Sequence, residues 1–247
     1  MSLASRFFRW HRWLGYLVAL QVLTWVAGGT LFAWLPFQGW VKSADHVRKP
    51  QAEWPAGWAQ RLAAGLPADL AASGVQAVAT AAGPALRVKS AGGERWFDAD
   101  GRELAPPDEA AVARFAASLY QGPGRLAALQ RLEHVPPRLG IVHELHARAP
   151  VWLARFDDPW QTRLYLDARS GELLAARNEA WVWYDFFWRL HVMDYGGGED
   201  FNNPLLRTAA PLALALVLTG AVLLTLALRR AWRTRRRQPA PQGHDQR

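Results

Sequence analysis

The chain has 247 residues, no cysteine, and a net charge of +8 from 29 Lys and Arg against 21 Asp and Glu. The missing cysteine excludes disulfides, thiolate metal sites and cysteine nucleophiles. The positive charge lies at the two ends, because residues 1–13 and 229–247 together carry +9 and leave −1 for the middle. This distribution is typical of the basic flanks of membrane segments and argues against a nucleic-acid surface.

Two apolar segments are long enough to cross a bilayer as helices. Residues 14–35 and 208–228 contain no charged side chain. About 20 residues in a helix cover the roughly 30 Å hydrocarbon core. The first segment is longer than the apolar region of a signal peptide and ends in an aromatic stretch, Trp34-Leu35-Pro36-Phe37. The sequence therefore predicts a retained anchor and a second span.

The basic ends predict the orientation, because Lys and Arg beside spans stay on the cytoplasmic side. Both termini are then cytoplasmic and the middle is extracytoplasmic. The predicted segments are a basic N-terminus (1–13), a first transmembrane helix (14–36), a periplasmic domain (37–180), an aromatic interfacial helix with a Gly-rich hinge (181–203), a second transmembrane helix (205–228) and a basic tail (229–247).

The central segment has the composition of a soluble α+β domain. Residues 58–66 and 108–120 have helical patterns, and Asp108 follows two prolines as a possible N-cap. Strand-like runs follow at 85–89 and 151–156. Residues 94–104 and 163–173 align with each other, each with an Asp, a turn Gly and a Glu-Leu pair. We expect a duplicated unit of one helix and an antiparallel sheet, at about 54–105 and 107–176.

Four motifs in this order resemble the PepSY-associated transmembrane proteins. They are residues 8–15 (Phe-Arg-Trp-His-Arg-Trp-Leu-Gly), residues 164–172 (Leu-Tyr-Leu-Asp-Ala-Arg-Ser-Gly-Glu), Arg189-Leu190-His191 and Leu218-Thr219-Gly220. The resemblance implies a bacterial inner-membrane protein with periplasmic PepSY modules. It also implies an association with iron uptake, since some larger members with four membrane helices are haem-containing ferric-siderophore reductases. This chain has only two predicted spans, so one copy cannot form a complete haem-binding bundle.

His11 and His191 are the candidate cofactor residues, as axial ligands of a b-type haem. An imidazole near the hydrocarbon edge can bind iron through one nitrogen while the other donates to a carbonyl. The alternative is that both histidines are ordinary interfacial residues. Their predicted positions at opposite edges of the bilayer are on the order of 30 Å apart. One chain then cannot clamp one haem between them, and a dimer or a partner subunit is needed.

No metal site is predicted. Residues 143–146, His-Glu-Leu-His, lack the i, i+4 spacing of a zincin helix. Residues 181–195 are predicted to form an aromatic amphipathic helix at the outer interface, and the glycines at 196–198 a hinge. No nucleophile pattern indicates an enzyme class.

Two hypotheses follow for the function. In the first, the chain is a PepSY-type component of envelope iron or haem handling, with haem-mediated electron transfer to ferric ligands as a dimer or with a partner. In the alternative, it is a non-enzymatic, membrane-tethered periplasmic module that binds a partner or regulates a peptidase. A sensor that couples an outer ligand to the basic tail is a third, weaker hypothesis.

Overall fold

The computed structural model describes residues 3–42, 46–145 and 149–237. The chain forms two compact units. The helical unit comprises Met1–Thr30 with Phe187–Arg247, and the sheet unit comprises Leu31–Phe186. Each unit has its own packing and is described by itself.

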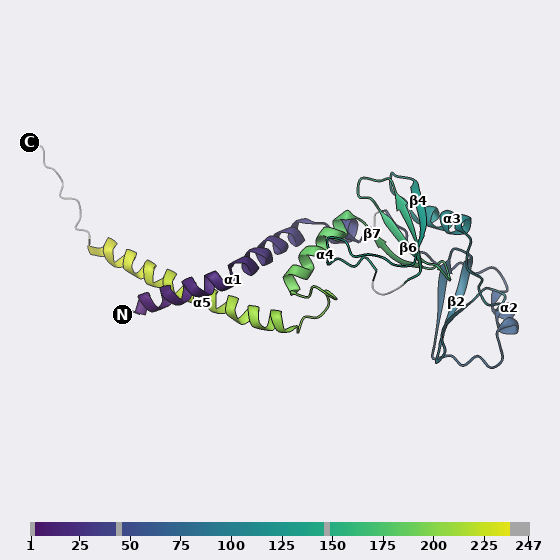
Figure 1. The fold of residues 1–247 in the computed structure, drawn as a ribbon, viewed down its shortest axis with the longest axis horizontal. Helices are drawn as coiled ribbons and strands as arrows, with labels where there is room; N and C mark the ends of the chain where they lie inside the picture. The colour runs from purple at the N-terminus through teal and green to yellow at the C-terminus, as the bar shows by residue number, and fades with distance from the viewer. Residues whose placement is uncertain (1–2, 43–45, 146–148, 238–247) are drawn as a thin grey trace, which may run out of the picture. The chain divides into compact units, whose positions relative to one another are not determined.

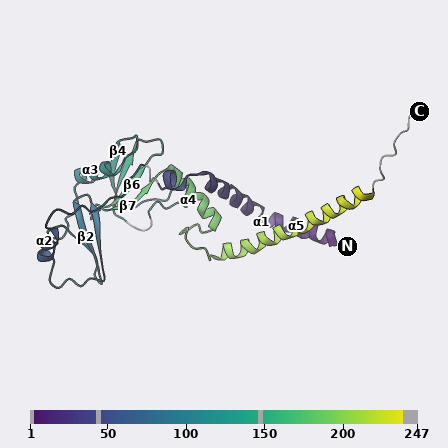
Figure 2. The same ribbon diagram turned by 180° about the vertical axis from the view of Figure 1, so that it is seen from behind.

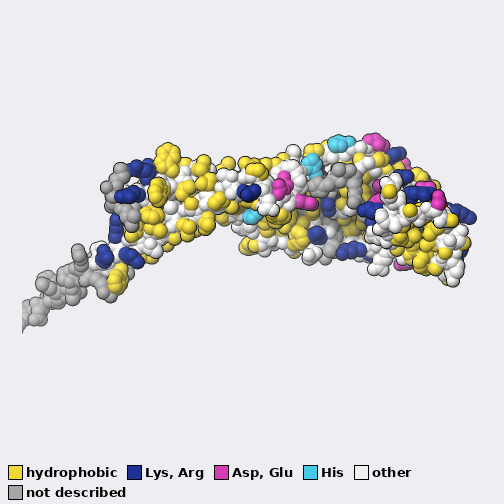
Figure 3. Space-filling view, turned by 90° about the horizontal axis from the view of Figure 1, so that it is seen from below, with side chains coloured by type: hydrophobic (Ala, Val, Ile, Leu, Met, Phe, Trp, Pro, Cys, Tyr) yellow, Lys and Arg dark blue, Asp and Glu magenta, His cyan; other side chains and the backbone are white. Residues whose placement is uncertain are grey.

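Two long helices dominate the helical unit, α1 (Leu3–Trp34) and α5 (Pro204–Arg237). Figures 1 and 2 show that the two helices cross each other and run in opposite directions. Their apolar stretches, Ala4–Trp34 and Pro204–Thr234, have mean hydropathies of 1.6 and 2.4 and are mostly exposed. Figure 3 shows apolar side chains covering this part, with Lys and Arg gathered at its end. The expected pair of membrane helices is confirmed, and the chain is a membrane protein.

The sheet unit begins with a three-stranded antiparallel sheet. Its strands β1 (Gly74–Thr80), β2 (Gly83–Ser90) and β3 (Gly93–Phe97) pair in chain order. Helix α2 (Trp58–Gly65) packs on this sheet, because its buried Leu62 joins Val88 and Phe97 in one apolar cluster.

A second helix and sheet follow in the same unit. Helix α3 (Glu109–Leu119) covers a four-stranded antiparallel sheet of β4 (Leu126–Leu132), β5 (Val151–Phe156), β6 (Arg163–Asp167) and β7 (Leu173–Arg177), in that order (Figure 2). The Asp108 side chain accepts from the Ala111 N–H at 2.6 Å, which confirms the predicted N-cap. Val112, Ala116 and Leu119 pack on Leu164 and Leu166 in the main core.

The two aligned segments form similar Asp-Gly turns, in which the glycine follows the Asp by three residues after β3 and by four residues after β6. After β3, Asp98 accepts from the Asp100 and Arg102 N–H groups, and Gly101 has a φ of +77°. After β6, Asp167 accepts from two backbone N–H groups in the same way, and Gly171 has a φ of +72°. The structure thus has two units of one helix and an antiparallel sheet, as expected from the duplication.

The remaining elements link these parts. A short π-helical turn, η1 (Phe37–Val41), follows Pro36, and α4 (Glu179–Val192) follows β7. Asn178 starts α4, because its side-chain oxygen accepts from the Trp181 N–H at 2.7 Å and its amide donates to the Trp40 carbonyl. Helix α4 therefore begins two residues before the predicted interfacial helix.

Candidate functional site

His11 lies on α1, at the contact between α1 and α5. Its Nδ1 is 3.1 Å from both the Leu216 carbonyl oxygen and the Thr219 hydroxyl. A Cβ added at Gly220 would lie 3.1 Å from the ring atom Cε1, so the imidazole is tightly packed against this glycine. The hydrogen bond to a carbonyl makes Nδ1 the donor and leaves Nε2 as the atom with a lone pair. Two residues of the Leu218-Thr219-Gly220 motif, Thr219 and Gly220, therefore contact the His11 ring.

This close packing makes Gly220→Ala a sensitive test of the helix contact. We expect the added methyl group to displace the ring and destabilise the helical unit by about 1–3 kcal/mol, as overpacking does. Thermal unfolding of the full-length protein in mild detergent measures the effect. Gly29→Ala is the matched control, because nothing lies within 4 Å of a Cβ at Gly29 on the same helix pair. Equal melting temperatures for the two variants would show that His11 does not pack on Gly220.

His191 lies in the last turn of α4, within the helical unit. The last carbonyl groups of a helix have no partner inside it. Here the Leu190 and His191 carbonyls accept from Gln21 Nε2 at 3.0 Å and Trp25 Nε1 at 2.7 Å, both on α1. The imidazole is 6.3 Å from the Trp188 ring and nearly parallel to it. The end of α4 is thus fixed on the middle of α1.

The contacts of the two histidines also give their separation. His11 and the Trp25 partner of His191 are 14 positions apart on α1, which corresponds to about 21 Å along the helix axis. This is shorter than the 30 Å expected from opposite membrane edges, because α4 packs against the middle of α1. It still exceeds the spacing of two axial ligands on one iron. The structure does not bring the two histidines together.

The glycine-rich segment after α4 is a closed turn, whereas the sequence suggested a loose hinge. The Asp194 carboxylate accepts from four backbone N–H groups, those of Gly196, Gly197, Glu199 and Asp200, at 3.0–3.2 Å. These hydrogen bonds, that of Asp200 first, lower the pKa of Asp194 to about 2. Arg189 is fully buried and donates to the Gly196 carbonyl at 2.9 Å. The carboxylate and the guanidinium order the turn.

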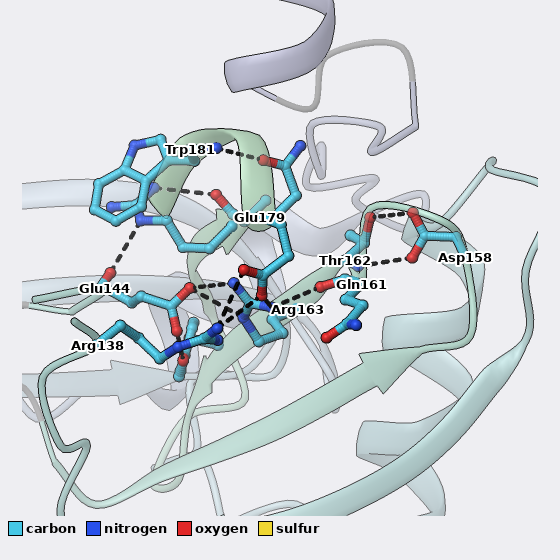
Figure 4. Close-up of polar contacts among 12 residues, drawn as sticks. Arg138, Glu144, Asp158, Gln161, Thr162, Arg163, Glu179 and Trp181 are labelled. Atoms are coloured by element: carbon cyan, nitrogen blue, oxygen red, sulfur yellow. Dashed lines mark hydrogen bonds and ion pairs between the residues drawn. The ribbon is translucent and has the colours of Figure 1, made fainter. Parts of the chain in front are cut away.

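A buried ion-pair cluster lies on the face of the second sheet away from α3 (Figure 4). Arg163 on β6 and Glu144 are 3% and 2% exposed, and Arg163 Nε and Nη2 donate to Glu144 Oε1 at 3.0 and 2.6 Å. Arg163 Nη1 donates to Glu179 Oε1 at 2.8 Å, and the Tyr165 hydroxyl donates to Glu144 Oε2 at 2.8 Å. Arg138 also donates to Glu179, at 2.9 Å. The cluster joins β6, the segment before β5 and the start of α4.

The electrostatics of this cluster fit a structural role. Burial raises the pKa of Tyr165, and the Glu144 charge raises it further. Burial opposes the charged form of Arg163, but Glu144 and Glu179 outweigh it and raise the pKa of the guanidinium. Tyr165 is therefore a donor and Arg163 a cation at neutral pH. The cluster holds the sheet together as a network of charged hydrogen bonds.

This cluster was not predicted from the sequence, where Glu144 stood out only as part of the His-Glu-Leu-His run. His146 of that run lies outside the described residues. A signal was present, because Arg163 and Tyr165 are two apart on a strand and therefore share one face of the sheet. Among the described residues, no group of three or more His, Asp or Glu side chains forms a metal site.

The fold and these contacts define a membrane protein in which two membrane helices flank a duplicated α+β unit. A family model described as the PepSY-associated TM region matches residues 8–244. The chain therefore belongs to the PepSY-associated transmembrane family, as the four sequence motifs indicated. Comparisons with curated proteins and with solved structures gave no match.

Proposed function

We propose that this protein takes part in iron or haem handling at the bacterial cell envelope, and that two copies, or one copy and a partner subunit, hold b-type haem through His11 or His191. The observation that carries the proposal is the fixed imidazole of His11. Its Nδ1 donates to the Leu216 carbonyl, which is the outer contact that a haem-ligating histidine ordinarily makes. Bound haem would supply one-electron transfer.

The residues around both histidines fit this role. Gly220 packs against the His11 ring, and the Leu216 carbonyl makes Nδ1 the donor, so that Nε2 remains for coordination. His191 lies beside the rings of Trp188 and Trp25, which provide an apolar aromatic flank. Because His11 and Trp25, the residue that holds His191, are about 21 Å apart along α1, each histidine suits a separate site shared with a second chain. Two such sites at different depths would suit electron transfer across the membrane.

Substitution of the two histidines tests the haem proposal. We expect His11→Ala or His191→Ala to remove at least half of the haem bound per chain and the matching reduced-form absorption bands, with membrane insertion unchanged. His134→Ala is the matched control, because His134 is an exposed histidine of the sheet unit and should leave the haem content unchanged. Full haem content in both test variants would contradict the assignment.

The proposed orientation places both termini in the cytoplasm and the sheet unit in the periplasm. It rests on the excess of arginine at residues 1–13 and 229–237, since basic flanks stay inside. A reporter fused after Arg237 should be active only in the cytoplasm, and one inserted near Gly122 only in the periplasm. The reverse pattern would overturn the charge argument.

The alternative function is a membrane-tethered module that binds a partner or regulates a peptidase without catalysis. One feature of the sheet unit favours it. Strand β4 is an edge strand of the second sheet, and its pairing with β5 is interrupted between Leu126 and Ala128. An edge strand offers unpaired backbone groups to an added chain. A protein without haem that still captures a periplasmic partner through the sheet unit would support this alternative.

A further inference from the structure

Three arginines form a row across the second sheet, on the face away from α3. Arg155 on β5 is the register partner of Arg163 on β6, and Arg163 is the partner of Arg177 on β7. Residues directly opposite each other on antiparallel strands point to the same face. Like charges in such positions repel, so each guanidinium needs a compensating partner.

Among the described residues, only Arg163 of the three has carboxylate partners, whereas Arg177 has a neutral polar and an aromatic contact. Arg163 pairs with Glu144 and Glu179. Arg177 donates to the Glu144 backbone carbonyl at 3.0 Å and lies 4.1 Å from the centre of the Trp181 ring. Arg155 is exposed, and no hydrogen bond or ion pair joins it to another residue in the described part of the chain. Arg155 is therefore the arginine of the row whose guanidinium has no hydrogen-bond or ion-pair partner in the described part of the chain.

Arg155 lines a pocket of about 250 Å³ at the β4 edge of this sheet. The other lining residues are Ala127, Ala128, Arg138, Phe156, Gln161 and Arg163. Figure 4 shows Arg138, Gln161 and Arg163 lying close together around the buried cluster. Arg138 uses Nη2 to bind Glu179 and is 40% exposed. The pocket thus presents guanidinium groups and no lining carboxylate among its described residues.

The charge and size of the pocket define what it can hold. Four guanidinium groups, those of Arg138, Arg155, Arg163 and Arg177, stand against the two carboxylates of Glu144 and Glu179, so an excess of positive charge remains around the pocket. A planar guanidinium matches a carboxylate in a two-pronged hydrogen bond. A carboxylate therefore complements the excess positive charge of this pocket. The small side chains of Ala127 and Ala128 also line the pocket, beside the carboxylate position, and suit a small apolar group of the ligand.

We propose that this pocket binds the terminal carboxylate of a small aliphatic ligand or of a peptide, with Arg155 and Arg138 as the anion-binding residues. A bound carboxylate relieves the repulsion between Arg155 and Arg163. A peptide source would place its last residues along the open edge of β4, whereas a small acid would occupy only the pocket. The site is independent of the histidines and does not depend on haem.

Titration calorimetry on the full-length protein in mild detergent tests the proposal. The probes are N-acetyl-tetra-alanine with a free C-terminal carboxylate, the same peptide as its C-terminal amide, butyrate and inorganic phosphate. We expect the free acid to bind at least tenfold more tightly than the amide, and phosphate to bind no more tightly than butyrate. Equal binding of acid and amide, tighter binding of phosphate, or no binding of the acid or butyrate at 10 mM would overturn the proposal.

Variants locate the site and separate binding from folding. Arg155→Gln should weaken carboxylate binding at least tenfold without lowering the melting temperature, because Arg155 makes no ion pair and its removal relieves the repulsion with Arg163. Arg131→Gln is the matched control, since it removes the same charge from β4 outside the pocket lining and should bind as the unmodified protein does. If butyrate binds as tightly as the peptide acid, the source is a small acid; if the peptide binds tighter, the source is a chain terminus. Unchanged binding in Arg155→Gln would contradict the assignment.

Discussion

Arg163→Met is expected to destabilise the sheet unit by about 3–5 kcal/mol. The substitution leaves the Glu144 carboxylate buried without its two guanidinium hydrogen bonds, and the loss of one partner from a buried ion pair has a cost of this size. Tyr165 still donates to Glu144, but a neutral hydroxyl cannot compensate the charge. For a chain of this length, the melting temperature should fall by roughly 10 °C.

The matched control for this variant is an exposed arginine of the same sheet unit. Arg61 pairs with Asp100 at 2.8 Å, but both side chains are more than 40% exposed. Arg61→Met should therefore cost less than about 1 kcal/mol. Thermal unfolding followed by circular dichroism compares the two variants. Similar small shifts for both would mean that the Arg163 cluster does not hold the sheet unit together.

Gly65→Ala is the second substitution with a large expected effect, about 3 kcal/mol. A Cβ at Gly65, the last residue of α2, would lie 1.9 Å from the Asp100 carbonyl oxygen, which is a backbone atom and cannot rotate away. A Cβ added at Gly101, the glycine of the turn after β3, would likewise lie 2.6 Å from the Gly65 carbonyl carbon. Helix α2 and the turn after β3 therefore meet through two glycines, and a methyl group must separate them.

Gly74→Ala gives the corresponding control. A Cβ at Gly74, the first residue of β1, has only an ordinary contact of 3.7 Å with the Lys89 side chain. Its melting temperature should stay close to that of the unmodified protein. A Gly65→Ala protein with the same melting temperature as Gly74→Ala would show that α2 does not pack on this turn.

The sequence predicted the parts of the fold that carry local signals. The Asp108 cap, the two Asp-Gly turns and the uncharged membrane helices each depend on residues close together in the chain. Strands β1 and β4 were missed. Strand β4, Leu-Ala-Ala-Leu-Gln-Arg-Leu, has a helix-forming composition and becomes a strand only through its pairing with β5. Such long-range pairing overrides local propensity.

In the candidate sites, too, residues in local motifs could be predicted, whereas contacts between distant parts of the chain could not. His11 and His191 could be named from motifs, but their partners on α5 and α1 lie 205 and 166 positions away in the sequence. The Arg163 cluster joins residues from three separate segments, so no short motif could contain it. The arginine row also became visible only when the strand register placed Arg155, Arg163 and Arg177 side by side.

Visible absorption spectra test the claim that the protein holds haem. The full-length protein should be purified in mild detergent from cells supplied with iron, and its oxidised and dithionite-reduced spectra recorded. If two chains share haem through His11 or His191, we expect sharp reduced-form bands and near-stoichiometric haem. A colourless protein from a preparation shown to be folded would contradict the claim and leave the tethered binding module as the function.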